Sequence, residues 1–168
     1  SVLPATIERL DDPALRRDLQ IASVLAGLAM GTTQTALAHS ISYPFTARFG
    51  MPHGIACSFT LAEVARYNGV TEAERLAPIA RGMGCSIEAL PEVLEVFFDQ
   101  LGLGGFVSRY VEPRVTDDFG ESLITRSRAA NNVRDVDGAE ARNIARRALD
   151  RICELRSMPT DDAVRLVG

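Results

Sequence analysis

The chain has 168 residues, of which 46 % are hydrophobic and 24 % charged, so it is long enough for one globular domain with a sizeable core. Its net charge of −4 argues against the basic surface that a nucleic-acid partner requires. All 18 basic residues are arginine, which excludes lysine Schiff-base chemistry and a P-loop lysine, and no glycine-rich dinucleotide-binding motif is present.

Helical periodicity begins in the N-terminal region. Asp12 is a suitable N-cap, and Pro13 follows it at the first helical position. After Ile21 this helix is apolar on nearly all sides, which predicts that it runs through the core. The next predicted helix carries His39, and we expect Pro44 to end or kink it.

Three further helices follow in the middle of the chain. One begins after Pro52 and closes at Asn68–Gly69, the next has Thr71 as its predicted N-cap, and the third opens at Pro91. The stretch Gly102–Gly105 then predicts a flexible break between helices.

The last third of the chain is less regular. It contains one strand candidate, Phe106–Val111, and a predicted helix over Glu121–Ala130. Asp137 caps a clearly amphipathic helix, and Thr160 is placed to cap a last short one.

These patterns together predict the fold class and the setting. Period-two alternation is nearly absent, so we expect an all-α chain, a bundle of about seven to nine helices that forms a single domain over residues 1–168. No apolar run is long enough for a membrane span, and no secretory signal pattern occurs. Three cysteines without metal-type spacing read as small buried side chains in a reducing, cytoplasmic setting.

The two histidines of the chain stand 14 residues apart, each next to a helix-breaking residue. A lone histidine on an apolar helix is usually structural, but a neutral imidazole is also the commonest transition-metal ligand. If the chain doubles back after Pro44, His53 comes to lie opposite His39, and two imidazoles make half of a metal site. The other ligands must then be acidic residues of this chain or groups outside it.

The segments Ala26–Met30, Ala38–Pro44 and Pro52–Ala56 together resemble the iron-containing (group III) alcohol dehydrogenase family. Asn131–Arg134 is similar to that family's Asn-Pro-Arg element, with Val133 in place of proline. The resemblance extends over essentially all 168 residues.

The resemblance implies an NAD(P)-linked oxidoreductase that interconverts a small alcohol and an aldehyde with a divalent metal, Fe²⁺ or Zn²⁺. The chain would be its C-terminal helical domain, which binds metal and substrate. The N-terminal dinucleotide-binding domain would be missing, together with an aspartate and a histidine that complete the metal site. NAD(P) would bind through that missing domain, so we expect the chain alone to be inactive. A homo-oligomer remains open.

Site residues follow from the same resemblance. It implies His39 and His53 as metal ligands. Tyr43 stands where the family often has a histidine beside the nicotinamide, which implies a catalytic and cofactor-contacting role, although the tyrosine pKa suits proton transfer near neutral pH poorly. Gly54 would leave room for the cofactor next to His53.

Three other residues are candidates for the substrate pocket. Met30 stands where the family often has an aromatic side chain, and it keeps that wall apolar and adaptable. Asn132 and Arg134 would shape the pocket, with a capped turn before the Asp137 helix as the structural alternative. The Ser-Tyr-Pro sequence that ends at Pro44 resembles reductases of phosphonate aldehydes within the family.

Two other functions stay open. A dehydroquinate-synthase-like lyase shares the two-domain architecture, but its helical half carries a Gly-His-Thr-type motif and a lysine-rich site that this chain lacks. The chain could alternatively be a non-enzymatic helical interaction or assembly module in which both histidines only pack.

Overall fold

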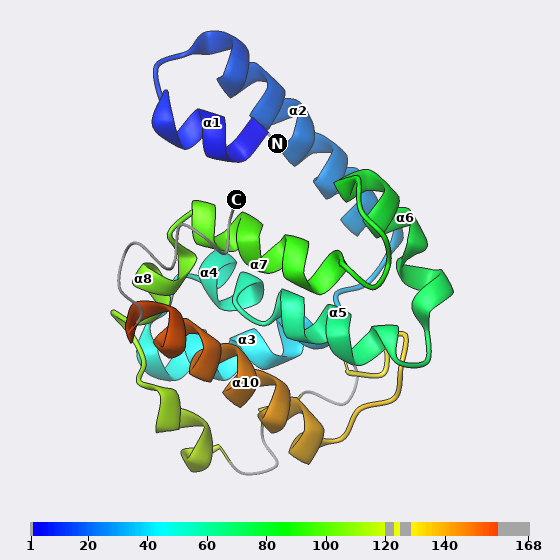
Figure 1. The fold of residues 1–168 in the computed structure, drawn as a ribbon, viewed down its shortest axis with the longest axis vertical. Helices are drawn as coiled ribbons and strands as arrows, with labels where there is room; N and C mark the ends of the chain where they lie inside the picture. The colour runs from blue at the N-terminus through cyan, green and yellow to red at the C-terminus, as the bar shows by residue number, and fades with distance from the viewer. Residues whose placement is uncertain (1, 120–122, 125–128, 158–168) are drawn as a thin grey trace. The chain divides into compact units, whose positions relative to one another are not determined.

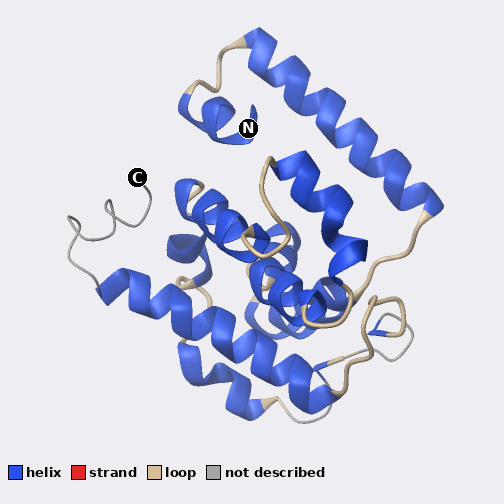
Figure 2. Cartoon of the chain, turned by 45° about the vertical axis from the view of Figure 1, so that its right-hand side comes forward, coloured by secondary structure: helices blue, strands red, loops and turns tan. Residues whose placement is uncertain are grey.

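The computed structural model describes residues 2–119, 123–124 and 129–157. Regular secondary structure in this part of the chain is entirely helical (Figure 2), which confirms the all-α prediction. The elements, in the order of Figure 1, are α1 (Val2–Glu8), α2 (Pro13–Thr32), α3 (Leu37–Phe49), α4 (His53–Ser58), α5 (Leu61–Gly69), α6 (Ala73–Met83), α7 (Leu90–Gln100), α8 (Leu103–Val107), the 3₁₀ helix η1 (Pro113–Asp118) and α10 (Gly138–Ser157).

Two predicted elements lie partly or wholly outside the residues that the structure describes. The helix expected over Glu121–Ala130 falls largely outside the described residues, and Thr160 falls outside them altogether. Among the described residues, no single helix is both long enough and apolar enough to cross a membrane.

Backbone packing divides the chain into two compact units, one of residues 1–35 and one that begins at Ala36. The first unit contains α1 and α2, which pack on each other, and the second contains all the remaining described helices. The single domain over residues 1–168 stays a prediction, because a compact pair of helices does not by itself define a separate domain.

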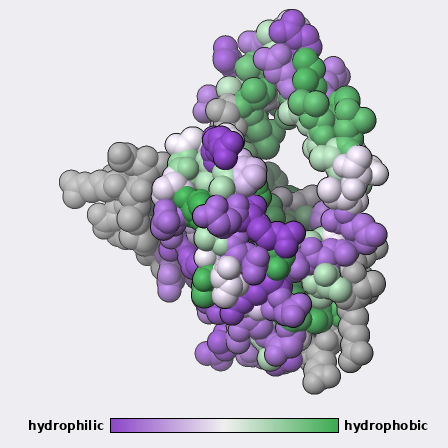
Figure 3. Space-filling model, turned by 90° about the vertical axis from the view of Figure 1, so that its right-hand side faces the viewer, coloured by the Kyte–Doolittle hydropathy of each residue, from purple (hydrophilic) through white to green (hydrophobic). Residues whose placement is uncertain are grey.

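Helix α2 begins as predicted but is not a core helix. The Asp12 carboxylate accepts hydrogen bonds from the backbone amides of Ala14 and Leu15, at 3.0 and 3.2 Å. No residue of α2 is buried, so the prediction that it runs through the core is wrong. The physical reason is that α1, at seven residues, is too short to cover a 20-residue neighbour within their unit. Apolar side chains therefore lie on the surface of this unit (Figure 3), namely those of Ile21, Val24, Leu25, Leu28 and Met30.

Helix α3 does not end at Pro44 but continues to Phe49. Leu37, Ile41 and Phe45 follow one another at helical spacing, and all three are fully buried. The Phe45 ring also packs against the rings of Phe49, Phe59 and Phe119, with centroids 4.9–6.2 Å apart. This aromatic packing stabilises the last turns of α3 and offsets the hydrogen bond that Pro44 cannot donate.

Several predicted boundaries also move. The helix predicted from Pro52 to Asn68 is interrupted at Phe59 and Thr60, which separates α4 from α5. Glu72, not Thr71, precedes α6, and it makes no side-chain cap bond. The predicted break is occupied by α8. The strand candidate Phe106–Val111 is also wrong, because its first two residues are the end of α8 and residues 108–110 form a turn; Val107 is buried in the core.

The core of the second unit is one large apolar cluster and one small one. Helix α10 supplies the inward-facing stripe that its periodicity predicts, and Asp137 caps it by accepting the Glu140 amide at 2.8 Å. The small cluster joins α5, α6 and α7 through Ala65, Leu76, Ala80 and Leu90. The large cluster is formed chiefly by Leu37, Ile41, Phe45, Met51, Ala56, Phe59, Val64, Val107, Val111, Phe119, Leu123, Ala141, Ile144, Ala145, Ala148 and Leu149.

Candidate metal centre

The structure brings the two histidines together. The ring centroids of His39 and His53 lie 5.3 Å apart, and the rings meet edge to face at 74°. His39, on α3, is half-buried, whereas His53, the first residue of α4, is exposed. The pair therefore lies at the edge of the core, with one ring partly inside and the other open to solvent.

The fold of α3 determines where His39 points. One face of this helix is held in the core by the buried side chains of Leu37, Ile41 and Phe45. His39 and Tyr43, which are four residues apart, share a different face of the same helix. Burial of the apolar face therefore orients both polar rings away from the centre of the core.

The turn between α3 and α4 brings His53 back to His39. Gly50 ends α3 with φ 67° and ψ 17°, a left-handed conformation that glycine adopts without a steric penalty. Its amide donates to the Thr46 carbonyl at 3.1 Å, and Met51 is fully buried. Pro52 then leads directly into α4. The reversal of the chain is thus made at Gly50, not at Pro44.

Tyr43 and Gly54 border the pair. The Tyr43 ring centroid is 5.8 Å from that of His53, and 37 % of the tyrosine is exposed. A Cβ atom added to Gly54 would meet no heavy atom within 4 Å, so space is open beside the His53 backbone. Their catalytic and cofactor-contacting roles stay predictions.

Sequence reasoning missed a third group, the thiol of Cys57. Its Sγ atom lies 3.5 Å from Nε2 and 3.9 Å from Nδ1 of His53. One ligand atom each of His39, His53 and Cys57 all lie within 4.8 Å of one another. The sequence signal is the spacing of four residues between His53 and Cys57, which places two side chains on one face of a helix.

Cys57 is half-buried and unoxidised, as are Cys85 and Cys153. Burial raises the pKa of the Cys57 thiol above its ordinary value, and a hydrogen bond with Ser42 opposes the shift. The side chain is therefore a neutral thiol at neutral pH in the metal-free protein, and a metal ion would have to displace its proton.

The other predicted pocket residues have different surroundings. Asn132 forms hydrogen bonds with Asn68 on α5, and the Arg134 guanidinium donates to the Tyr67 carbonyl at 2.8 Å and stacks on the Tyr67 ring at 4.0 Å. These contacts support the structural alternative, and their role in a substrate pocket stays a prediction. Met30 belongs to the N-terminal unit, which the structure does not relate to the histidines.

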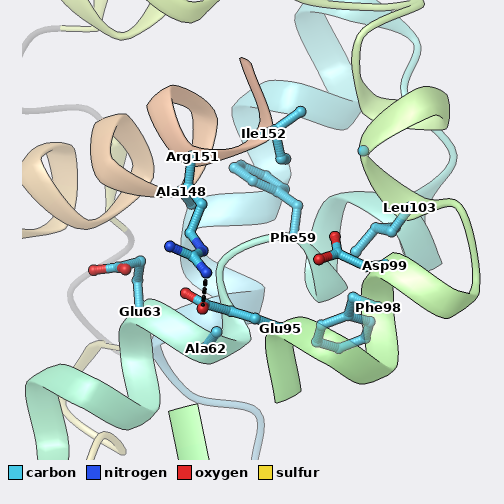
Figure 4. Close-up of a pocket in the computed structure, with 11 residues that line it drawn as sticks. Phe59, Ala62, Glu63, Glu95, Phe98, Asp99, Leu103, Ala148, Arg151 and Ile152 are labelled. Atoms are coloured by element: carbon cyan, nitrogen blue, oxygen red, sulfur yellow. Dashed lines mark ion pairs between the residues drawn. The ribbon is translucent and has the colours of Figure 1, made fainter. Parts of the chain in front are cut away.

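A second candidate site is the pocket among α5, α7, α8 and α10 (Figure 4). Glu95, which is 9 % exposed, pairs there with Arg151 at 2.6 Å and with Arg66 at 3.1 Å. Burial raises the pKa of Asp99 at the same pocket. The buried Glu95 carboxylate already has cationic partners, and neither histidine lines this pocket, so the histidine cluster is the stronger candidate for chemistry.

The comparison with known families agrees with the all-helical fold. The chain belongs to the Fe-containing alcohol dehydrogenase family, whose C-terminal model matches residues 1–102. The match includes the segments around Met30, His39 and His53 and ends before Asn131–Arg134.

Curated relatives are alcohol dehydrogenases and aldehyde reductases. The phosphonoacetaldehyde reductase of Streptomyces viridochromogenes is 44 % identical over 73 residues, which are 44 % of this chain and 18 % of that protein. The 1,3-propanediol dehydrogenase of Klebsiella pneumoniae is 36 % identical over 45 % of this chain and 19 % of its own length. The 1-propanol dehydrogenase of Salmonella typhimurium is 38 % identical over 52 % of this chain and 24 % of its own length. The match thus spans less than a quarter of each relative, and no solved structure matches the chain.

Proposed function

We propose that the chain is the helical part of a metal-dependent, NAD(P)-linked oxidoreductase that interconverts a small alcohol and its aldehyde. The observation that carries the proposal is the meeting of His39 and His53, 5.3 Å apart by ring centroid, inside the segment that matches the family. Family membership also favours an oxidoreductase over a lyase or an assembly module.

The two histidines are the proposed metal ligands. Imidazole nitrogens bind a divalent ion at about 2.0–2.1 Å, which requires two such ligands to approach within roughly 3.5 Å of each other. Ligand atoms of His39 and His53 already lie within 4.8 Å, so modest side-chain rotation suffices. The donor set fits a transition metal, since no carboxylate takes part in this cluster among the described residues.

A bound divalent ion would act as a Lewis acid that polarises the carbonyl oxygen of an aldehyde or stabilises the corresponding alkoxide. Tyr43, whose ring centroid is 5.8 Å from that of His53, is the proposed hydrogen-bond donor to that oxygen. Tyrosine hydroxyls ordinarily lose their proton only near pH 10, so at neutral pH such a group serves as a donor.

Hydride transfer requires a nicotinamide cofactor, and we propose that NAD(P) binds outside these 168 residues, which contain no glycine-rich dinucleotide motif. Gly54 would let the nicotinamide approach the metal ligands, because the space beside it is open. One relative is named an NAD-dependent methanol dehydrogenase and another an NADPH-dependent butanol dehydrogenase, so both cofactors occur among the relatives. The chain alone is then inactive.

The test is aldehyde reduction by the intact protein with NADH and NADPH, before and after the metal is removed with a chelator. His39→Ala and His53→Ala should each lower kcat/KM at least roughly a hundredfold, since Lewis-acid stabilisation supplies several kcal/mol. Ser58→Ala, at the end of the same helix as His53, is the control and should keep its activity. Full activity after metal removal, or ordinary turnover by the 168-residue chain alone, would contradict the proposal.

A further inference from the structure

We propose that Cys57 is a third metal ligand, so that this chain holds a thiophilic divalent ion, Zn²⁺ in the first place, through two imidazoles and one thiolate. The inference rests on the proposed function, because it requires that His39 and His53 bind metal. It goes beyond that function in two ways. It adds a third ligand, and it favours Zn²⁺ over Fe²⁺, which two imidazoles alone would bind about equally well.

The first argument is distance. Zinc lies about 2.1 Å from an imidazole nitrogen and 2.3 Å from a thiolate sulfur, so a tetrahedral ion separates these two ligand atoms by roughly 3.6 Å. The observed separation between Cys57 Sγ and His53 Nε2 is 3.5 Å. The sulfur and the imidazole therefore already stand at the spacing of two ligands on one ion.

The second argument is the arrangement of the helices. His53 and Cys57 are one helical turn apart on α4, and His39 comes from α3, so three ligands converge from two packed helices. Burial of Ala56 holds the backbone of the six-residue α4 against the core, so the two ligands on it start from one fixed helix.

The third argument is donor chemistry. Thiolate sulfur is a soft ligand that favours Zn²⁺ and Co²⁺ over Fe²⁺ at a given set of nitrogen ligands. As the metal–sulfur bond forms, the thiol proton leaves to the solvent, and the sulfur keeps the electron pair that it shares with the ion. No oxidant or reductant is involved.

The probe is Co²⁺, titrated into the full chain under reducing conditions and followed by absorption. A thiolate ligand gives a near-ultraviolet sulfur-to-cobalt charge-transfer band, whereas imidazoles alone give only the weaker visible bands. We expect the wild type to show both, and Cys57→Ser to lose the charge-transfer band while it keeps visible bands. Zn²⁺ competition should give an affinity on the order of a hundredfold weaker for Cys57→Ser.

Cys85→Ser is the matched control, since Cys85 is also a free, half-buried cysteine but donates to the Ala80 carbonyl. It should keep the charge-transfer band and the Zn²⁺ affinity of the wild type. Visible bands without a charge-transfer band in the wild type itself would overturn the role of Cys57 and leave the two histidines as ligands. Failure of the wild type to bind either ion would overturn both this inference and the metal role of the histidines in this chain.

Discussion

Asn68 and Asn132 exchange two side-chain amide hydrogen bonds, of 3.1 and 2.8 Å, although they stand 64 positions apart in the sequence. Asn68 is only 5 % exposed, and Asn132 also donates to the Arg134 carbonyl at 2.8 Å. The pair therefore ties the loop that precedes α10 to the C-terminal end of α5.

We expect Asn132→Ala to lower the free energy of unfolding by about 1–3 kcal/mol, because the buried Asn68 amide loses its partner. Denaturant unfolding followed by circular dichroism measures the change. Asn143→Ala, which removes an exposed 3.4 Å bond from Arg146, should change stability by less than about 0.5 kcal/mol. Equal stability of Asn132→Ala and the wild type would remove the structural role and return Asn132 to the pocket candidates.

A second prediction concerns the buried carboxylate of Glu63, whose side chain is 8 % exposed and which pairs with Arg66 and, at 2.9 Å, with Arg147. Glu63→Ala should destabilise the protein by about 1–2 kcal/mol, since it releases two arginines that water can partly solvate. Glu63→Gln keeps the shape and one acceptor and should lose less. Glu112, which is exposed and makes no cap bond, provides the control Glu112→Ala. Thermal unfolding that fails to rank these three variants in that order would contradict the argument.

A third prediction tests the turn that joins the two histidine-bearing helices. Gly50→Ala should cost about 1–2 kcal/mol, because alanine is strained at φ 67°. It should also weaken Co²⁺ binding, since relief of the strain moves α4 relative to α3. Gly54→Ala meets no neighbour within 4 Å in helix α4, so it should not lower stability and should leave metal binding unchanged. Co²⁺ titration and denaturant unfolding of both variants measure these two effects. If Gly50→Ala bound Co²⁺ as tightly as the wild type, the turn would not position the ligands.

A fourth prediction isolates the hydroxyl of Tyr43. Tyr43→Phe keeps the ring that lies 5.8 Å from His53 but removes the donor, so kcat of the intact protein should fall about a hundredfold. Metal content should stay the same, because the phenol is not among the proposed ligands. Steady-state kinetics and metal analysis of Tyr43→Phe and the wild type test both expectations. An unchanged kcat would leave Tyr43 with a packing role only.

Sequence reasoning finds the histidine pair but not the reason for its convergence. The spacing of His39 and His53 predicts that the chain doubles back between them, and Pro44 is the helix-breaking residue that follows His39 most closely. Proline costs a helix one hydrogen bond, which the buried aromatic ring of Phe45 compensates, so the reversal lies at Gly50 instead. Tertiary packing of this kind has no local signature.

Cys57 and α2 show two other limits of the sequence pattern. The four-residue spacing of Cys57 from His53 is visible in the sequence, but a cysteine within an apolar run indicates first a small core side chain. The apolar composition of α2 predicts a core helix, but composition alone does not show whether a neighbouring element covers its apolar faces. The fold class and the α10 stripe are predictable because they depend on periodicity alone.

The connection from α3 to α4 has consequences for the order of folding. Only three residues separate the two helices, so little loop-closure entropy opposes the encounter of the imidazoles. Contacts of such short sequence range form fast, whereas the Asn68–Asn132 tether must wait for chain segments 64 positions apart to meet. The two proposed histidine ligands can thus meet while α10 is still undocked.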